Sequence, residues 1–131
     1  MKDYYQSKKS AYKLPKPIYA KIVKTIQSYD FYKCVVDAVN SRSETILRDF
    51  DSVNRATAEY YIENIDDALE KCVNEEYRNA VFEHTARNVA YDLLENKYGI
   101  SASTMKRWTQ RFVYGVAVNL GEDFPDYETA S

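Results

Sequence analysis

The chain has 131 residues, of which 45% are hydrophobic and 29% charged, and its formal net charge at pH 7 is −2. This length suits one compact domain, and the hydrophobic content excludes a wholly disordered chain. Glycine and proline are absent between Ile18 and Tyr98, which predicts an all-α fold of about five or six helices.

The small net charge conceals a segregation of charge along the chain. Residues 1–24 carry seven lysines and a single acid, Asp3. Residues 59–76 have the opposite bias: their only base is Lys71, and their acids are Glu59, Glu63, Asp66, Asp67, Glu70, Glu75 and Glu76. Between Asn96 and Gly121 there is no acid, and the bases are Lys97, Lys106, Arg107 and Arg111. Two basic ends therefore flank an acidic middle, and this local pattern says more about partners than the net charge does.

The N-terminal residues 1–16 mix lysine, serine and tyrosine without helical periodicity, so we expect a flexible basic arm there. Pro17 suits the first turn of a helix, because its missing N–H would have no intrahelical partner at that position. Apolar residues at helical spacing follow, and they predict one long helix from about Ile18 to Asn40.

The middle of the chain is expected to contain shorter helices. The polar segment Asn40–Thr45 is predicted to be a connection, followed by a short helix at residues 45–50. Asp51 or Ser52 is expected to cap the next helix, which carries the acidic face and ends near Asn74.

Two further helices are predicted before the first internal glycine. Val81 lies on the first of them, and a break is expected near Arg87 or Asn88. The second helix runs from there to Tyr98, with Leu93 and Leu94 turned inward. Together, these elements predict one helical domain over residues 17–121 and an acidic tail over residues 122–131.

The stretch YGISASTMKRWTQRFV, residues 98–113, combines a helix stop, a turn and a helix start. Gly99 can adopt the left-handed conformation that a helix C-terminus commonly needs. Ile100 is expected to fill the angle between the two helices, and Ser101 or Ser103 to cap the second one. Gly121 supplies the next stop signal, so a helix-turn-helix is predicted at about residues 88–120.

The second helix of this motif is expected to have two faces. Its apolar stripe should pack on the domain and consists of Met105, Trp108, Phe112 and Val116. The side chains off this stripe are mainly long donors and hydroxyls, which read base edges and hold phosphates in the major groove. The predicted DNA-binding residues are Ser101, Ser103, Thr104, Lys106, Arg107, Gln110 and Arg111. A recognition helix presents its first turns to the bases, and these turns carry Ser103, Thr104, Lys106 and Arg107. Gln110 and Arg111 lie farther along the helix and are expected to reach phosphate.

The segment GISASTMKRW resembles the turn and second helix of the helix-turn-helix in sigma-factor region 4, with its pattern G-[IV]-S-x-x-T-[apolar]-x-R. Together with KLPKPIYAKIVKTIQSYD, the acidic middle and YGISASTMKRWTQRFVYGVAVNLGE, it makes most of the chain similar to phage late-gene transcription regulators of the RinA and ArpU type. Only the helix-turn-helix part of this resemblance is specific. The resemblance implies a small helical activator that binds the promoters of late phage genes in the bacterial cytoplasm and contacts the host RNA polymerase.

One position departs from the usual helix-turn-helix pattern. A small residue, often alanine, commonly stands four positions before the turn glycine, and this chain has Glu95 there. The larger side chain predicts either a wider crossing of the two helices or a different packing of the preceding helix.

Two interpretations compete with DNA binding. In one, the motif is a helical hairpin in an all-α core, since short turn motifs produce many false matches. In the other, the chain is a non-enzymatic helical phage protein that binds a host or phage protein through its acidic middle helices.

The sequence does not indicate catalysis, a metal or a cofactor. His84 is the only histidine and has no nucleophile at a catalytic spacing, and the acids follow no metal-ligand pattern. Cys34 and Cys72 are expected to be small buried hydrophobes in a reducing cytoplasm. We therefore expect a soluble, intracellular, non-enzymatic DNA-binding protein without a membrane segment. A homo-oligomer is expected as well, because one recognition helix reads only a half-site.

Overall fold

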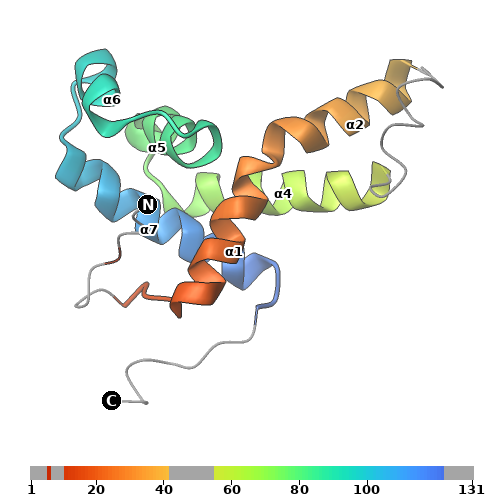
Figure 1. Ribbon diagram of the computed structural model, residues 1–131, viewed down its shortest axis with the longest axis horizontal. Helices are drawn as coiled ribbons and strands as arrows, with labels where there is room; N and C mark the ends of the chain where they lie inside the picture. Colours follow the sequence, from red (N-terminus) through yellow and green to blue (C-terminus); the bar gives the residue numbers. More distant parts are fainter. Residues whose placement is uncertain (1–5, 7–10, 42–54, 123–131) are drawn as a thin grey trace.

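The computed structural model describes residues 6, 11–41 and 55–122, and the regular elements of this part of the chain are all helices (Figure 1). The six helices are α1 (Lys16–Gln27), α2 (Tyr29–Ser41), α4 (Arg55–Cys72), α5 (Glu75–Arg87), α6 (Tyr91–Tyr98) and α7 (Ala102–Asn119). The predicted all-α class is confirmed. The predicted helix at residues 45–50 and the predicted cap at Asp51 or Ser52 lie outside the described residues.

Helix α7 is the centre of the domain and contacts α1, α4, α5 and α6. Its predicted apolar stripe is largely confirmed, since Met105, Phe112 and Val116 are each fully buried. Trp108 lies at the edge of the same stripe, half-buried and packed against the core. Most of the buried residues of α7 lie from Thr109 to Ala117, whereas Ser103 and Arg107 in its first turns are exposed.

The predicted long helix from Ile18 to Asn40 is wrong, because Ser28 divides it into α1 and α2. The N–H of Ser28 donates to the carbonyl of Thr25 at 3.1 Å, three residues back, which tightens and ends α1. The hydroxyl of Ser28 donates to the Lys24 carbonyl, a type of contact that often bends helices. The new helix has a new buried face, so Val35 and Ala38 are buried while Val36 is only half-buried.

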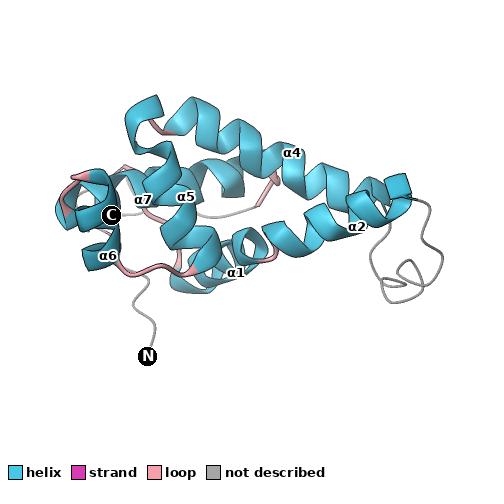
Figure 2. Cartoon of the chain, turned by 90° about the horizontal axis from the view of Figure 1, so that it is seen from above, coloured by secondary structure: helices cyan, strands magenta, loops and turns pink. Residues whose placement is uncertain are grey.

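Helices α2 and α4 lie side by side and extend away from the rest of the molecule, whereas α5, α6 and the start of α7 gather at the other end (Figure 2). The two extended helices pack through small and medium buried residues, which include Ala58 and Ile62 of α4. Tyr32 and Tyr61 stack with ring centroids 5.0 Å apart, which links the two helices at their surface. Cys34 is exposed on α2, so the expectation that it is buried was wrong.

The boundaries of the last helices follow the signals in the sequence closely. Asn74 precedes α5, and Asn88 ends it in the left-handed conformation with φ of 59°. Since Asn88 and the two residues after it do not belong to a helix, α6 starts at Tyr91. Leu94 of α6 is fully buried as predicted, but Leu93 is 61% exposed and does not turn inward.

The residues just before α1 are packed on the domain and do not form the end of a free arm. Leu14 is fully buried in the main core. The side-chain amide of Gln6 donates to the Leu14 carbonyl at 3.0 Å and accepts from the Leu14 N–H at 2.8 Å. The predicted arm of residues 1–16 is therefore too long at its C-terminal end, because the buried Leu14 side chain belongs to the core.

None of the described helices combines the length and the apolar character needed to span a bilayer.

Candidate nucleic-acid interface

Helices α5, α6 and α7 form a three-helix unit with a small core of its own. Each helix contributes one buried side chain to this core: Ala80, Leu94 and Met105. Partly buried hydrophobic residues surround them, and these are Val89, Tyr91, Tyr98 and Ile100. Ile100 therefore fills the angle between α6 and α7, as its place after the turn glycine predicted.

The turn between α6 and α7 depends on Gly99. This residue has φ of 69°, and its N–H donates to the Glu95 carbonyl at 2.8 Å, which closes the last turn of α6. A Cβ atom at Gly99 would meet nothing within 4 Å, so glycine is favoured here by the backbone conformation and not by space.

Ser101 caps the start of α7. Its hydroxyl oxygen accepts from the Thr104 N–H at 3.2 Å, and the two hydroxyl oxygens are 2.9 Å apart. The predicted cap at this position is confirmed. Both hydroxyls are therefore hydrogen-bonded within the cap, where they stabilise the first turn of α7.

Glu95 completes the same cap. Its carboxylate accepts from the Ala102 N–H at 3.1 Å, while its side chain is exposed. The buried α6 residue is the neighbouring Leu94, so Glu95 lies outside the crossing of α6 and α7. A carboxylate here occupies the anion site that a helix N-terminus provides, which leaves the side chains of the first turns as the surface for a partner.

The structure separates the predicted DNA-binding residues by their exposure. Ser101, Ser103 and Arg107 are exposed, whereas Thr104, Lys106 and Arg111 are half-buried. Gln110 is only 3% exposed, and its side-chain amide donates to the Tyr12 carbonyl at 3.3 Å. The prediction that Gln110 reaches phosphate is therefore wrong, because the segment before α1 covers it.

Three of these residues share one face of α7. Ser103, Arg107 and Arg111 follow at intervals of four residues, which places them in a row along the helix. The row starts at the exposed end of α7 and leads toward the covered half of the helix. Lys106 lies to one side, with its ammonium 5.7 Å from the centre of the Tyr91 ring.

Aromatic rings hold the guanidinium groups of this face. The Arg107 and Arg111 guanidinium carbons lie 6.0 and 4.8 Å from the centre of the Trp108 ring. Tyr77 stacks on Trp108, with centroids 5.6 Å apart. Arg111 also lies 4.9 Å from the centre of the Tyr12 ring. Sequence reasoning missed Tyr12 as part of this surface, because it is 98 residues from Gln110 and only the fold brings it there.

Lys97, the base of residues 96–121 that precedes α7, pairs with an acid: its ammonium lies 3.0 Å from the Glu83 carboxylate. Tyr98 donates a hydrogen bond to the same carboxylate. These contacts, first the Tyr98 hydroxyl and then the Lys97 ammonium, lower the pKa of Glu83 below its usual value. Glu83 therefore ties α5 to the end of α6 and neutralises Lys97, so the candidate surface is carried by the bases of α7.

His84 supports the same three-helix unit. Its Nδ1 atom lies 2.8 Å from the Val89 carbonyl oxygen, and its ring stacks on Tyr91 with centroids 3.8 Å apart. These contacts position the connection between α5 and α6. In the described part of the chain, no three His, Cys, Asp or Glu side chains gather as a metal-ion site.

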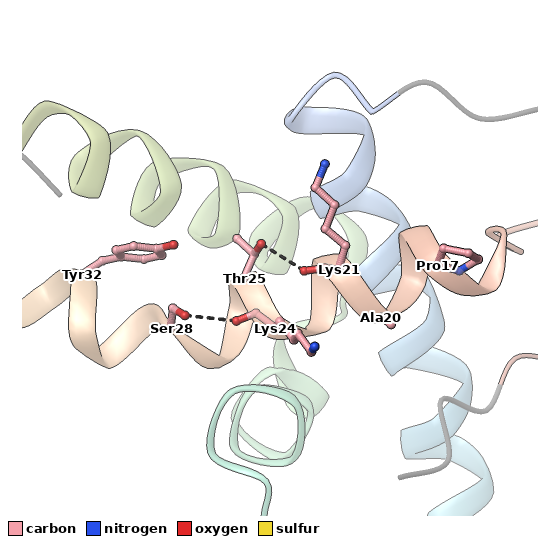
Figure 3. A pocket seen from close by; sticks show the side chains of 7 residues that line it. All are labelled: Pro17, Ala20, Lys21, Lys24, Thr25, Ser28 and Tyr32. Atoms are coloured by element: carbon pink, nitrogen blue, oxygen red, sulfur yellow. Dashed lines mark hydrogen bonds between the residues drawn. The ribbon is translucent and has the colours of Figure 1, made fainter. Parts of the chain in front are cut away.

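An open depression on the exposed side of α1 offers less chemistry than α7 (Figure 3). The hydroxyl of Thr25 donates to the Lys21 carbonyl, and that of Ser28 to the Lys24 carbonyl. The Lys21 ammonium pairs with Glu122 at 2.7 Å, which also raises the pKa of Lys21. The two hydroxyls donate to carbonyls of their own helix, and the Lys21 ammonium pairs with Glu122. These groups therefore do not converge on a common ligand.

Comparison with known proteins gives no relative for this chain: no protein-family model, curated protein or solved structure matches it.

Proposed function

We propose that this protein is a sequence-specific DNA-binding regulator that inserts the first turns of α7 into the major groove. The observation that carries the proposal is the division of α7 into two faces. Arg107 and Ser103 are exposed at its start, while Met105 on the opposite side is fully buried in the three-helix core. A helix that packs on its domain through one face and exposes hydrogen-bond donors on the opposite face has the geometry of a recognition helix.

The length and placement of the exposed part suit this role. The major groove of B-DNA is about 12 Å wide and admits an α-helix. Because α7 is covered from Thr109 onward on its inner side, the domain would approach DNA with the end of the helix that carries Arg107. Arg107 is suited to guanine because its planar guanidinium can donate two hydrogen bonds to O6 and N7. Arg111, farther along the row, is suited to a backbone phosphate.

The resemblance of the sequence to phage late-gene regulators supports a late promoter as the natural target and transcription activation as the outcome. The geometry of α5, α6 and α7 is compatible with that role, since the turn and the cap have the residues that the resemblance relies on: Gly99, Ser101 and Thr104. A two-fold dimer would place two copies of α7 on successive half-sites, about 34–36 Å apart.

The competing proposal, protein binding through the acidic helices, has less support. Two of the acids on α4 are used within the domain. Asp66 accepts a hydrogen bond from the Tyr29 hydroxyl at 2.8 Å, and Asp67 accepts from Asn119 and pairs with Lys71, both at 3.0 Å. These contacts give part of the acidic face a structural purpose.

A salt titration separates the two proposals. We expect the protein to bind a fluorescein-labelled DNA duplex at low salt, with a plot of log affinity against log salt falling with a slope of about −2 or steeper, because each neutralised phosphate contributes about −0.9. Fluorescence polarisation measures both quantities. If no duplex binds at any salt concentration, DNA binding is excluded and the acidic surface becomes the stronger candidate.

A further inference from the structure

The segment before α1 contacts the candidate DNA-binding helix, since its Tyr12 carbonyl is 3.3 Å from the side-chain amide of Gln110 on α7. The Tyr12 ring packs edge-on against Tyr114, with centroids 5.5 Å apart and an interplanar angle of 85°. The carbonyl of Tyr12 accepts the hydrogen bond from Gln110. Tyr12 is thus joined to α7 through both its ring and its backbone.

The position of this segment is fixed on its other side as well. Leu14 is buried in the main core, and the Gln6 amide satisfies both backbone groups of Leu14. A segment that is anchored before any partner binds has already lost most of its conformational freedom, so it can contribute to binding without a large entropy cost.

The guanidinium of Arg111 lies close to two aromatic rings. Its central carbon lies 4.9 Å from the Tyr12 ring centre and 4.8 Å from that of Trp108. Attraction between a cation and ring faces at these distances fixes the position of the group. The N–H donors of a guanidinium lie in its plane, and arginine can bind a phosphate with two parallel hydrogen bonds.

We propose that residues 11–15 are a second element of the DNA-binding surface and that Tyr12 positions Arg111 on a phosphate beside the groove that receives α7. This inference rests on the proposed function and extends it, because it assigns duplex DNA as the partner of a segment that the helix-turn-helix does not include. Tyr12 acts through Arg111 and is a positioning residue, whereas Arg111 makes the phosphate contact.

Leucine at position 12 tests the proposal, because it retains apolar bulk and removes the aromatic face. Since a cation–π contact contributes about 0.5–2 kcal/mol, we expect Tyr12→Leu to weaken duplex binding by about twofold to thirtyfold. The control variant Tyr12→Phe keeps the aromatic ring and should bind the duplex with wild-type affinity. Polarisation titrations with the same labelled duplex measure these changes, and thermal unfolding followed by circular dichroism shows that the variants are folded.

The coupling between the two residues separates positioning from general stabilisation. Arg111→Ala should make the salt slope less negative by about 0.9, the amount for one phosphate contact. Adding Tyr12→Leu to Arg111→Ala should then cause no further loss of affinity. A Tyr12→Leu effect that is equally large with and without Arg111 would overturn the positioning role.

The single tryptophan provides a readout that depends on the location of the DNA. Trp108 contacts Arg111, so duplex binding should change Trp108 fluorescence, and Arg111→Ala should diminish that change. If the wild type binds duplex while Tyr12→Leu leaves affinity and salt slope unchanged, this inference is overturned and the proposed function stands. If the wild type binds no duplex, the proposed function itself fails, and this inference fails with it.

Discussion

Replacing Phe112 with alanine is expected to lower the free energy of unfolding by about 3–5 kcal/mol, the usual cost of truncating a buried aromatic side chain. Phe112 is fully buried in the main core, where residues of α1, α4, α5 and α7 meet. Phe112 is among the largest fully buried side chains of the described residues, so its truncation would leave a large cavity. Urea denaturation of the wild type and the variant, with linear extrapolation to water, measures the difference.

Phe31 provides a matched control for this prediction. It lies on α2 and is 40% exposed, so Phe31→Ala removes the same side chain where little core packing is lost. We expect it to cost less than about 1 kcal/mol, as exposed substitutions usually do. Similar losses for the two variants would contradict the placement of α7 at the centre of the domain.

Replacing Arg107 with alanine is expected to weaken DNA binding by about 5-fold to 150-fold, which corresponds to the 1–3 kcal/mol of a good bidentate base contact. Arg107 is exposed on the first turns of α7, and its guanidinium carbon lies over the Trp108 ring at 6.0 Å from the ring centre. Its removal should therefore change the free energy of unfolding by less than about 0.5 kcal/mol. Polarisation titrations of both proteins on one duplex give the affinity ratio.

Lys33 supplies the control for charge. It is exposed on α2, which extends away from the end of the molecule that holds the start of α7. Lys33→Ala changes the net charge by the same amount as Arg107→Ala, but charges more than about 10 Å apart are largely screened at 0.1 M salt. It should leave the affinity nearly unchanged. Equal losses for the two variants would mean that DNA responds to overall charge and that α7 has no special role.

The ends of the last three helices were predictable because their signals are local. Asn88, Gly99 and Gly121 all have positive φ, and each ends or follows a helix at the place its residue type indicates. The break at Ser28 was not predictable in the same way. Serine within an amphipathic pattern is compatible with a continuous helix, and the break depends on hydroxyl contacts and on the packing of α2 against α4.

The candidate site shows the same division between local and distant causes. The exposure of Arg107 and the cap at Ser101 follow from spacing along α7. The burial of Gln110 does not, because its cover is Tyr12, which lies far away in the sequence. A prediction from helical spacing alone treats every residue off the apolar stripe as exposed, and it fails wherever another segment crosses the helix.

The contact that Glu95 makes could not be predicted from its departure from the usual helix-turn-helix pattern. The sequence shows only that a large side chain replaces a small one before the turn. In the structure this side chain points to the start of α7 and accepts from the Ala102 N–H, so α6 and α7 still pack through Leu94. A carboxylate that can reach a helix N-terminus gains a hydrogen bond and a favourable interaction with the helix dipole.

The central claim, that DNA binds the exposed face of α7, is tested most directly by recording amide chemical shifts of isotope-labelled protein while an unlabelled duplex is added. Because phosphate contacts are independent of sequence, a duplex without the natural operator suffices at low salt. We predict that the largest changes occur from Ser103 to Arg107, with further changes at Arg111 and Tyr12. Changes confined to the exposed acids Glu63 and Glu70 of α4, or no changes at all, would contradict the claim.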